Sequence, residues 1–193
     1  MKHNNTFHPA LRVLHWVMAA AIMAMLFIGV AMVSTVSSLH GLLVAIHKPL
    51  GLMILMLVIV RLWLRFSTAK PALPATLPAW QKFLAHLSHW ALYAMMLAQP
   101  LIGWAMLSAA GYPVTLGHFV LPPIVPISNN AYAILRPLHS LVAMALFITV
   151  MLHLAAALYH ALILRDGVFS SMAGAYKRKR LTRGALDNPT DAE

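Results

Sequence analysis

The sequence predicts an all-α integral membrane protein built as a bundle of four transmembrane helices. Hydrophobic residues make up 61% of the 193 residues and charged residues only 9%, whereas a soluble domain carries about 25% charged residues. The apolar residues gather into four blocks, and each block is long enough to cross a bilayer, which takes about 20 residues. Histidines recur near the ends of these blocks, where ionisable side chains are rare unless they have a function.

The charge balance and the lack of cysteine exclude several classes of protein. The chain has 14 lysines and arginines against 4 acidic residues, which gives a net charge of +10. These charges flank the apolar blocks and form no folded basic surface, so we exclude nucleic-acid binding. Because there is no cysteine, the chain forms no disulfide, thiolate-bound metal site or iron–sulfur cluster, and it attaches no haem covalently through C-x-x-C-H.

The first predicted span covers residues 12–34 and has His15 and Trp16 near its beginning. A cleavable signal peptide is the competing interpretation, and its apolar region would be about 7–15 residues long. The apolar region here is longer than that range, so we expect an uncleaved span.

The second predicted span covers residues 46–66 and follows a short connection that contains His40. His47 lies at the start of this span. Pro49 falls in its first turn, a position that tolerates proline because the missing N–H has no helical partner there. We therefore expect His47 near one membrane surface and His40 on the surface of the protein.

A proline-rich linker leads to the third predicted span, residues 81–108, which begins with His86 and His89 on one helix face. The following connection, residues 109–134, is apolar but too rich in proline and glycine to span the membrane. We expect it to form a lid or a short interfacial helix at the outer surface, with His118 exposed.

The fourth predicted span, residues 135–165, contains His139 and His153. They are separated by 14 residues, which is four helical turns less roughly 40°, so both side chains lie on one face of the helix. Along the helix axis they are about 21 Å apart. One metal ion cannot bind both, because imidazole–metal bonds are only about 2 Å long. The four spans define a membrane domain over residues 1–176, followed by a basic tail, 177–193, that we expect to be disordered.

The distribution of positive charge predicts the orientation. An even number of spans places both termini on one side of the membrane. Twelve of the 14 lysines and arginines lie on that side, and the two on the other side are Lys48 and Arg136. By the positive-inside rule both termini are cytoplasmic, and the protein is a multi-pass protein of a bacterial inner membrane.

This orientation sorts four histidines into two pairs by depth. His15 and His153 fall near the cytoplasmic surface, and His47 and His139 fall near the outer surface. Two imidazoles on opposite faces of a planar iron macrocycle are the axial ligands of a low-spin b-type haem, an arrangement that favours electron transfer over oxygen binding. The alternative is that they are packing or interfacial histidines, but four at matched depths favour the ligation of two haem groups.

Five further residues are candidates for contacts with the haems or with a quinone. Arginine forks match carboxylates, so Arg12 and Arg61 are candidates for the inner haem propionates. His86, His89 and His160 lie at the same cytoplasmic level. They could bond propionates, carry protons to a quinone, or replace one of the four ligands. The alternative, interfacial histidines bonded to water, stays open.

Short motifs recur in order along the spans, and they are R-x-x-H-W from Arg12, I-H and R-L-x-L-R-F in the second span, A-H-L-x-H from Ala85, P-L-I-G from Pro100, and L-H-x-A-A-A-L-x-H from Leu152. Together these motifs resemble the bacterial cytochrome b561 family of small di-haem inner-membrane proteins. The resemblance covers the chain to about Arg180 and implies that His15, His47, His139 and His153 are the axial ligands of two haem b groups. It also implies quinone as an electron partner, and that some members oxidise superoxide and pass the electron to ubiquinone.

The expected function is therefore electron transport in a respiratory chain, from a donor at the outer face to membrane quinone. A narrower version is a superoxide:ubiquinone oxidoreductase, which Lys48 and Arg136 would favour by attracting a small anion. The alternative is a membrane anchor and electron-relay subunit for a separate periplasmic redox protein. A metal or proton transporter is disfavoured because the spans lack acidic residues. The sequence leaves the oligomeric state open.

Overall fold

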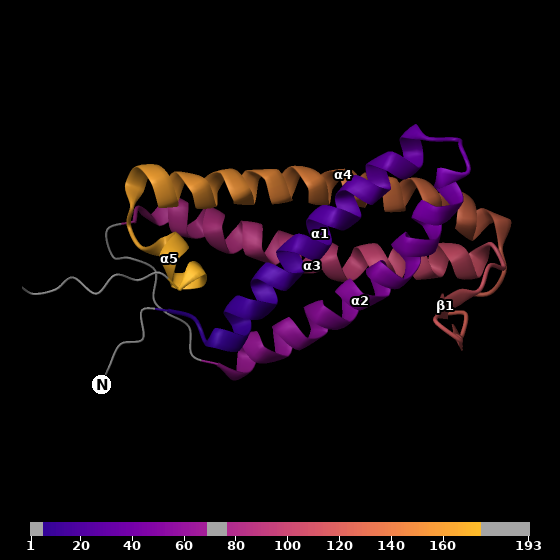
Figure 1. Ribbon diagram of the computed structural model, residues 1–193, viewed down its shortest axis with the longest axis horizontal. Coiled ribbons are helices and arrows are strands. Elements are labelled where there is room, and N and C mark those ends of the chain that lie inside the picture. Colours follow the sequence, from indigo (N-terminus) through magenta and orange to yellow (C-terminus); the bar gives the residue numbers. More distant parts are fainter. Residues whose placement is uncertain (1–5, 69–76, 175–193) are drawn as a thin grey trace, which may run out of the picture.

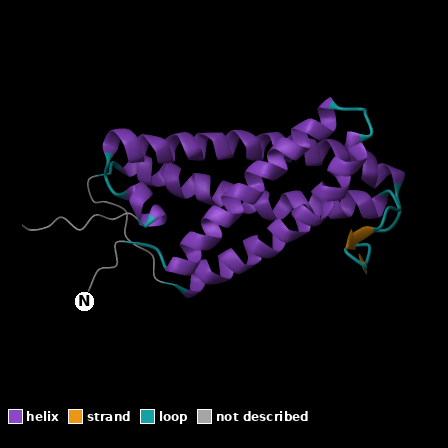
Figure 2. Cartoon of the chain, viewed as in Figure 1, coloured by secondary structure: helices purple, strands orange, loops and turns teal. Residues whose placement is uncertain are grey.

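The chain folds as four long antiparallel helices with a small hairpin at one end (Figures 1 and 2). The computed structural model describes residues 6–68 and 77–174. Each of the four helices is long and apolar enough to cross a membrane, which confirms the predicted fold class. The elements are α1 Pro9–Ser34, α2 Leu39–Ser67, α3 Ala79–Ala109, β1 Val114–Leu116, β2 Phe119–Leu121, α4 Asn129–Tyr159, a π-helical turn His160–Leu164 that continues α4, and α5 Val168–Ala173.

The bundle has two distinct ends, which we name by what they carry. At the terminal end, α1 begins, α4 ends and the short α5 folds back from the end of α4 toward the beginning of α1 (Figure 1). There the backbone N–H of Phe7 donates to the carbonyl of Ser171 at 3.1 Å, so both ends of the described chain lie together. The opposite end carries the β-hairpin and is called the hairpin end. The predicted basic tail, 177–193, lies outside the described residues.

All four long helices begin earlier than the sequence predicts, α2 and α4 by the largest margin. Helix α2 starts at Leu39, so His40 lies in its first turn and not in a connection, with Nδ1 3.1 Å from the carbonyl oxygen of Met32. Helix α4 starts at Asn129, six residues before the predicted 135. The reason is a cap: the hydroxyl of Ser128 accepts a hydrogen bond from the N–H of Ala131 at 3.2 Å and satisfies one of the first-turn donors.

The connection between α3 and α4 forms a β-hairpin, so the alternative of a short interfacial helix is wrong. Strands β1 and β2 are antiparallel, with Leu116 opposite Phe119, and the turn between them consists of Gly117 and His118. Gly117 has φ +60°, a value that glycine adopts freely and that a two-residue hairpin requires. His118 is exposed, as expected.

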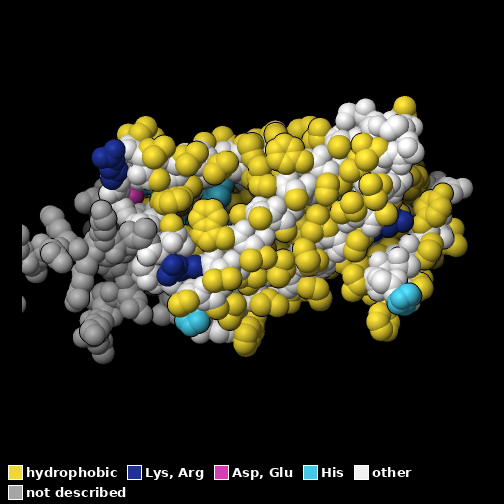
Figure 3. All heavy atoms as spheres, in the orientation of Figure 1, with side chains coloured by type: hydrophobic (Ala, Val, Ile, Leu, Met, Phe, Trp, Pro, Cys, Tyr) yellow, Lys and Arg dark blue, Asp and Glu magenta, His cyan; other side chains and the backbone are white. Residues whose placement is uncertain are grey.

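The helices pack as two close pairs, α1 with α2 and α3 with α4, and α2 also contacts α3. In the described chain, the backbone of α4 makes little or no close contact with that of α1 or α2. The apolar core fills the middle of the bundle, while the outer faces of the helices are covered with hydrophobic side chains (Figure 3), as a lipid environment requires. The core consists of Met18, Ile22, Ile54, Val58, Leu92, Met96 and Leu146.

Val58 is a direct test of this core because its side chain is fully buried, whereas its neighbour Ile59 is 46% exposed on the outer face of α2. We expect Val58→Ala to lower the free energy of unfolding by roughly 1–3 kcal/mol, since it leaves a cavity between helices. The matched control, Ile59→Ala, should cost much less. Thermal unfolding in detergent, followed by circular dichroism, measures both, and equal losses would contradict the packing described here.

Candidate functional site

Three helices of the bundle repeat one spacing. In each helix two residues separated by 14 positions, four turns or about 21 Å, share one face, and a buried apolar residue lies halfway between them. The three series are His47, Ile54 and Arg61 in α2, His89, Met96 and Gly103 in α3, and His139, Leu146 and His153 in α4.

This repeat divides the interior into two levels with an apolar layer between them. The hairpin level contains His47, His139 and Gly103. The terminal level contains Arg61, His89 and His153, and α1 adds His15 to it, seven residues before the buried Ile22. Two polar levels separated by about 21 Å of helix suit two separate groups, one at each level.

At the hairpin level, the imidazoles of His47 and His139 face each other across the space between α2 and α4. Their ring centres are 6.2 Å apart and the ring planes make an angle of 69°. The Nδ1 atoms of both rings are buried and make no hydrogen bond within the described chain. Because α2 and α4 have little backbone contact, the two side chains bridge a gap between the helices.

Helix α3 fixes the position of His139. The side-chain Nε2 of Gln99 donates to the backbone carbonyl of His139 at 2.9 Å. One turn later, a Cβ atom on Gly103 would lie 3.1 Å from Cε1 of the His139 ring and 3.5 Å from its Nδ1. Only glycine allows the imidazole to come this close to the helix without displacement.

At the terminal level, His153 has two histidine neighbours. The ring centre of His15, on α1, is 6.4 Å from that of His153, with the planes at 75°. The ring centre of His89, on α3, is 5.5 Å from it, at 64°. Three helices therefore bring imidazoles to one place.

The ring separations can be compared with what a six-coordinate haem iron requires. Imidazole nitrogen–metal bonds of about 2 Å on each side of the iron, plus about 1.1 Å from each nitrogen to its ring centre, put the ring centres about 6.2 Å apart. The pairs His47–His139 and His15–His153 have this separation. The pair His89–His153 is too close. The donor set and the loose contact of α4 with α1 and α2 thus fit a haem at each level.

Arg61 is a charged residue buried at the terminal level. Its side chain is only 9% exposed. Nη1 donates to the carbonyl of Leu11 on α1 at 3.1 Å, and Nε donates to the hydroxyl of Tyr93 on α3 at 3.1 Å. Arg61 therefore links three helices through neutral acceptors. One turn further along α2, Arg65 lies over the ring of Phe7, 5.2 Å from its centre.

The other basic and histidine candidates near the terminal level are dispersed. Nη2 of Arg12 donates weakly to the carbonyl of Ala173, the last residue of α5, at 3.4 Å, and Nε of Arg12 is buried without a partner in the described chain. His86 is exposed, and its Nδ1 lies 2.6 Å from the carbonyl of Lys82. His160 bonds Asp166 through Nδ1 at 2.6 Å.

The two basic residues predicted for the outer surface lie at the hairpin end. Lys48 follows His47 directly in α2 and is half-buried, and Arg136 is exposed one turn before His139 in α4. They therefore lie near the hairpin level without entering it.

Sequence analysis missed several residues that shape the site. Gln99 and Tyr93 are hydrogen-bonding side chains within an otherwise apolar span, and that contrast was the available signal. Asp166 is the only acidic residue in the described chain, and besides bonding His160 it accepts from the N–H of Val168 at 3.1 Å. It thereby sets the turn into α5, which no sequence pattern predicted.

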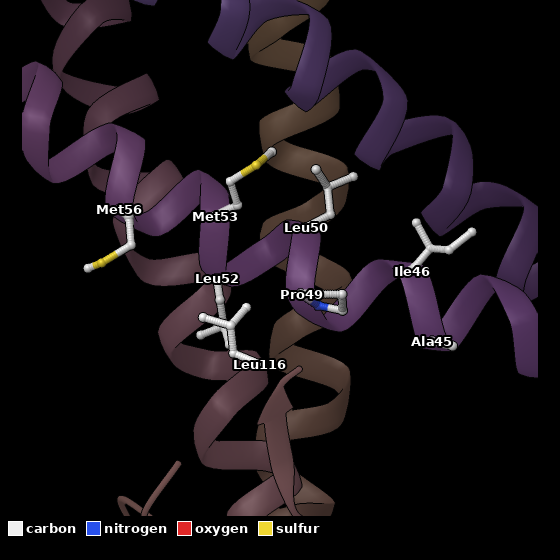
Figure 4. A pocket seen from close by; sticks show the side chains of 8 residues that line it. All are labelled: Ala45, Ile46, Pro49, Leu50, Leu52, Met53, Met56 and Leu116. Atoms are coloured by element: carbon white, nitrogen blue, oxygen red, sulfur yellow. The ribbon is translucent and has the colours of Figure 1, made fainter. Parts of the chain in front are cut away.

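A groove on α2 lies away from these levels. It is lined by apolar side chains only, among them Pro49, Met53 and Met56, with Leu116 of the hairpin at one edge (Figure 4). None of the histidines lines it. The groove offers no hydrogen-bonding side chain to a polar ligand, so it is not part of the candidate site.

Comparison with known proteins shows which family this chain resembles. Residues 6–175 match the family model of prokaryotic cytochrome b561. The chain is similar to cytochrome b561 homolog 1 of Escherichia coli K12, with 29% identity over 70% of this chain and 77% of the relative. It is also similar to the probable superoxide oxidase CybB of Yersinia pestis, with 28% identity over 66% and 72% of the two chains, and to cytochrome b561 homolog 2 of E. coli K12, with 27% identity over 83% and 87%.

The match covers all four helices, the hairpin and both histidine levels. It agrees with the membrane-spanning bundle and with a chain that binds b-type haem for electron transport. The chain belongs to the prokaryotic cytochrome b561 family.

Proposed function

We propose that this protein carries two b-type haems and transfers electrons from a donor at the hairpin end to membrane quinone. The observation that supports it most is the two imidazole pairs, His47–His139 and His15–His153, each with the ring separation that axial ligation requires. His139 and His153 on α4 give one ligand to each level. Arg12 and Arg61 at the terminal level are the candidates for propionate contacts.

The chain's own residues determine what the site does. When bound, each haem supplies an iron centre that exchanges one electron at a time. The paired imidazoles would hold the iron from both sides, and a haem held in this way would favour electron transfer over oxygen binding. Gln99 and Gly103 hold His139 in position, and the apolar middle layer keeps water from the space between the two levels.

We propose that the hairpin end faces the outside of the inner membrane and that both termini are cytoplasmic. Among the described residues, lysine and arginine gather toward the terminal end, and the hairpin end has Lys48 and Arg136, which is the positive-inside pattern. Lys48 and Arg136 would raise the local concentration of a small anion. Superoxide is the donor that this placement and the similarity to a probable superoxide oxidase favour.

The electron balance of this reaction is simple. Two superoxide anions release one electron each and become two molecules of oxygen. One ubiquinone takes up both electrons together with two protons and becomes ubiquinol. At the terminal level, His89 and His160 are the candidates for passing these protons, because His160 is paired with Asp166 and His89 is exposed beside His153.

The ligand assignment is tested by removing one histidine of α4 at a time. We expect His139→Ala and His153→Ala each to bind one haem per chain, because each removes one axial ligand at one level. The exposed His118 of the hairpin provides the control, and His118→Ala should keep two haems. Reduced-minus-oxidised spectra and a pyridine haemochrome assay measure the content. Two haems in both α4 variants would contradict the assignment.

The donor is tested by rapid mixing of the oxidised protein with superoxide. We expect haem reduction faster than the uncatalysed rate, and an increase in ubiquinol when ubiquinone is present. Lys48→Gln combined with Arg136→Gln should slow the reduction, with the largest effect at low ionic strength because the steering is electrostatic. If superoxide reduces the protein no faster than background, the carrier has another donor.

The close approach of Gly103 to His139 gives a test that acts on one level only. We expect Gly103→Leu to displace the His139 ring and weaken haem binding at the hairpin level, because even a Cβ atom would lie 3.1 Å from Cε1. Gly29→Leu is the control, since nothing lies within 4 Å of that position. Haem content and reduced-minus-oxidised spectra are measured for both variants. Equal haem content and equal spectra in the two variants would contradict the contact between Gly103 and His139.

A further inference from the structure

We infer that Arg61 raises the reduction potential of the haem at the terminal level above that at the hairpin level, and so directs electrons toward the terminal end. The inference rests on the proposed function. It assigns to Arg61 a role beyond holding helices together or contacting a propionate, and it begins from the position of this side chain in α2.

Arg61 has on α2, at the terminal level, the position that His47 has at the hairpin level. The two are 14 residues apart on one helix face, the same relation that links His139 and His153 on α4. Arg61 therefore points toward the terminal histidines from the one helix that gives that level no histidine. Its electrostatic neighbours include all three of them, which are His15, His89 and His153.

No carboxylate in the described chain offsets this charge. Asp166 is the only acidic residue there, and it is bonded to His160 and to the backbone of α5. The partners of Arg61 are a carbonyl and a phenol, both neutral. Because the side chain is 9% exposed, water screens its charge poorly, and its field acts strongly within the bundle.

The hairpin level lacks such a charge. The electrostatic neighbours of His47 and His139 are a histidine and the backbone of Gln99, with no lysine or arginine among them in the described residues. Lys48, next to His47, is half-buried, and Arg136 is exposed, so water and salt screen both charges more than that of the buried Arg61. The two levels therefore have similar ligands in different electrostatic surroundings.

The sign of the effect follows from the reaction. Reduction adds one negative charge at the iron, and a fixed positive charge nearby stabilises that added electron. Arg61 thus favours the reduced state at the terminal level. Both levels are proposed to have two imidazole ligands, so the ligands themselves do not produce a difference in potential. An electron that arrives at the hairpin level then moves downhill toward the terminal level.

The test measures potentials in variants that keep a single haem. A His139→Ala protein should retain only the terminal haem, and a His153→Ala protein only the hairpin haem, so each potentiometric titration reports one assigned level. We expect the terminal haem to have the higher potential. If the hairpin haem has an equal or higher potential, the inference is overturned. If neither variant retains one haem, the proposed function itself fails.

The charge of Arg61 is then changed in the His139→Ala background. Arg61→Gln should lower the potential enough to change the reduction equilibrium tenfold or more, which is about 59 mV for one electron. Arg61→Lys should leave the reduction potential close to that of the protein with Arg61, because it keeps the charge. Tyr93→Phe removes only a hydrogen-bond partner and should change it little. A loss of potential in Arg61→Lys as large as in Arg61→Gln would show that the charge is not the cause.

Arg65→Gln is the matched control for position. Arg65 has the same charge on the same helix one turn further on, where it lies over Phe7. It is an electrostatic neighbour of His89, as Arg61 is, but not of His15 or His153, so we expect a smaller shift from its loss. Equal shifts for Arg61 and Arg65 would overturn the inference, since they would indicate a general effect of net charge. If Arg61→Gln loses haem while the remaining haem keeps its potential, Arg61 is only an anchor of the cofactor and the inference is wrong.

Discussion

The separation between two facing imidazoles, just over 6 Å, is the constraint on which the rest of this structure depends. Under the proposed function, side chains from different helices have to point at each other and still leave room for an iron macrocycle. That requirement would account for the separation of the α4 backbone from α1 and α2, although α4 packs closely on α3. The stability of the bundle then has to come from the pairs α1–α2 and α3–α4 and from the apolar layer between the levels.

Much of the fold and part of the site could be predicted from sequence. Hydropathy predicts four spans, and the 14-residue spacing on α4 places His139 and His153 on one face. The sequence places His89 at the level of His153, but the rotation of α3 about its axis is not encoded in this spacing. The direct approach of the His89 ring to His153 and that of Gly103 to His139 were therefore not predicted. The hairpin was missed because it depends on two turn residues, and α5 because six residues give no recognisable period.

Each level contains a pair of facing histidines, but the residues around the two pairs differ. The hairpin level is completed by a glycine and a glutamine on α3, and the terminal level by an arginine on α2 and a third histidine on α3. Burying Arg61 is unfavourable unless its hydrogen bonds are satisfied, and Leu11 and Tyr93 supply them from two other helices. These hydrogen bonds offset the cost of burial and leave the charge beside the histidines of the terminal level.

The proposed ligation also bears on how a donor would be recognised. If two imidazoles hold each iron, a donor cannot bind the metal and has to deliver its electron from the edge of the site. The ligands would then not distinguish one donor from another, and under the proposed function the side chains at the hairpin end would do so. Lys48 and Arg136 are the basic groups there in the described chain. A family can in this way keep one carrier and change its donor through surface residues alone, which is why family membership indicates electron transport more firmly than it indicates superoxide.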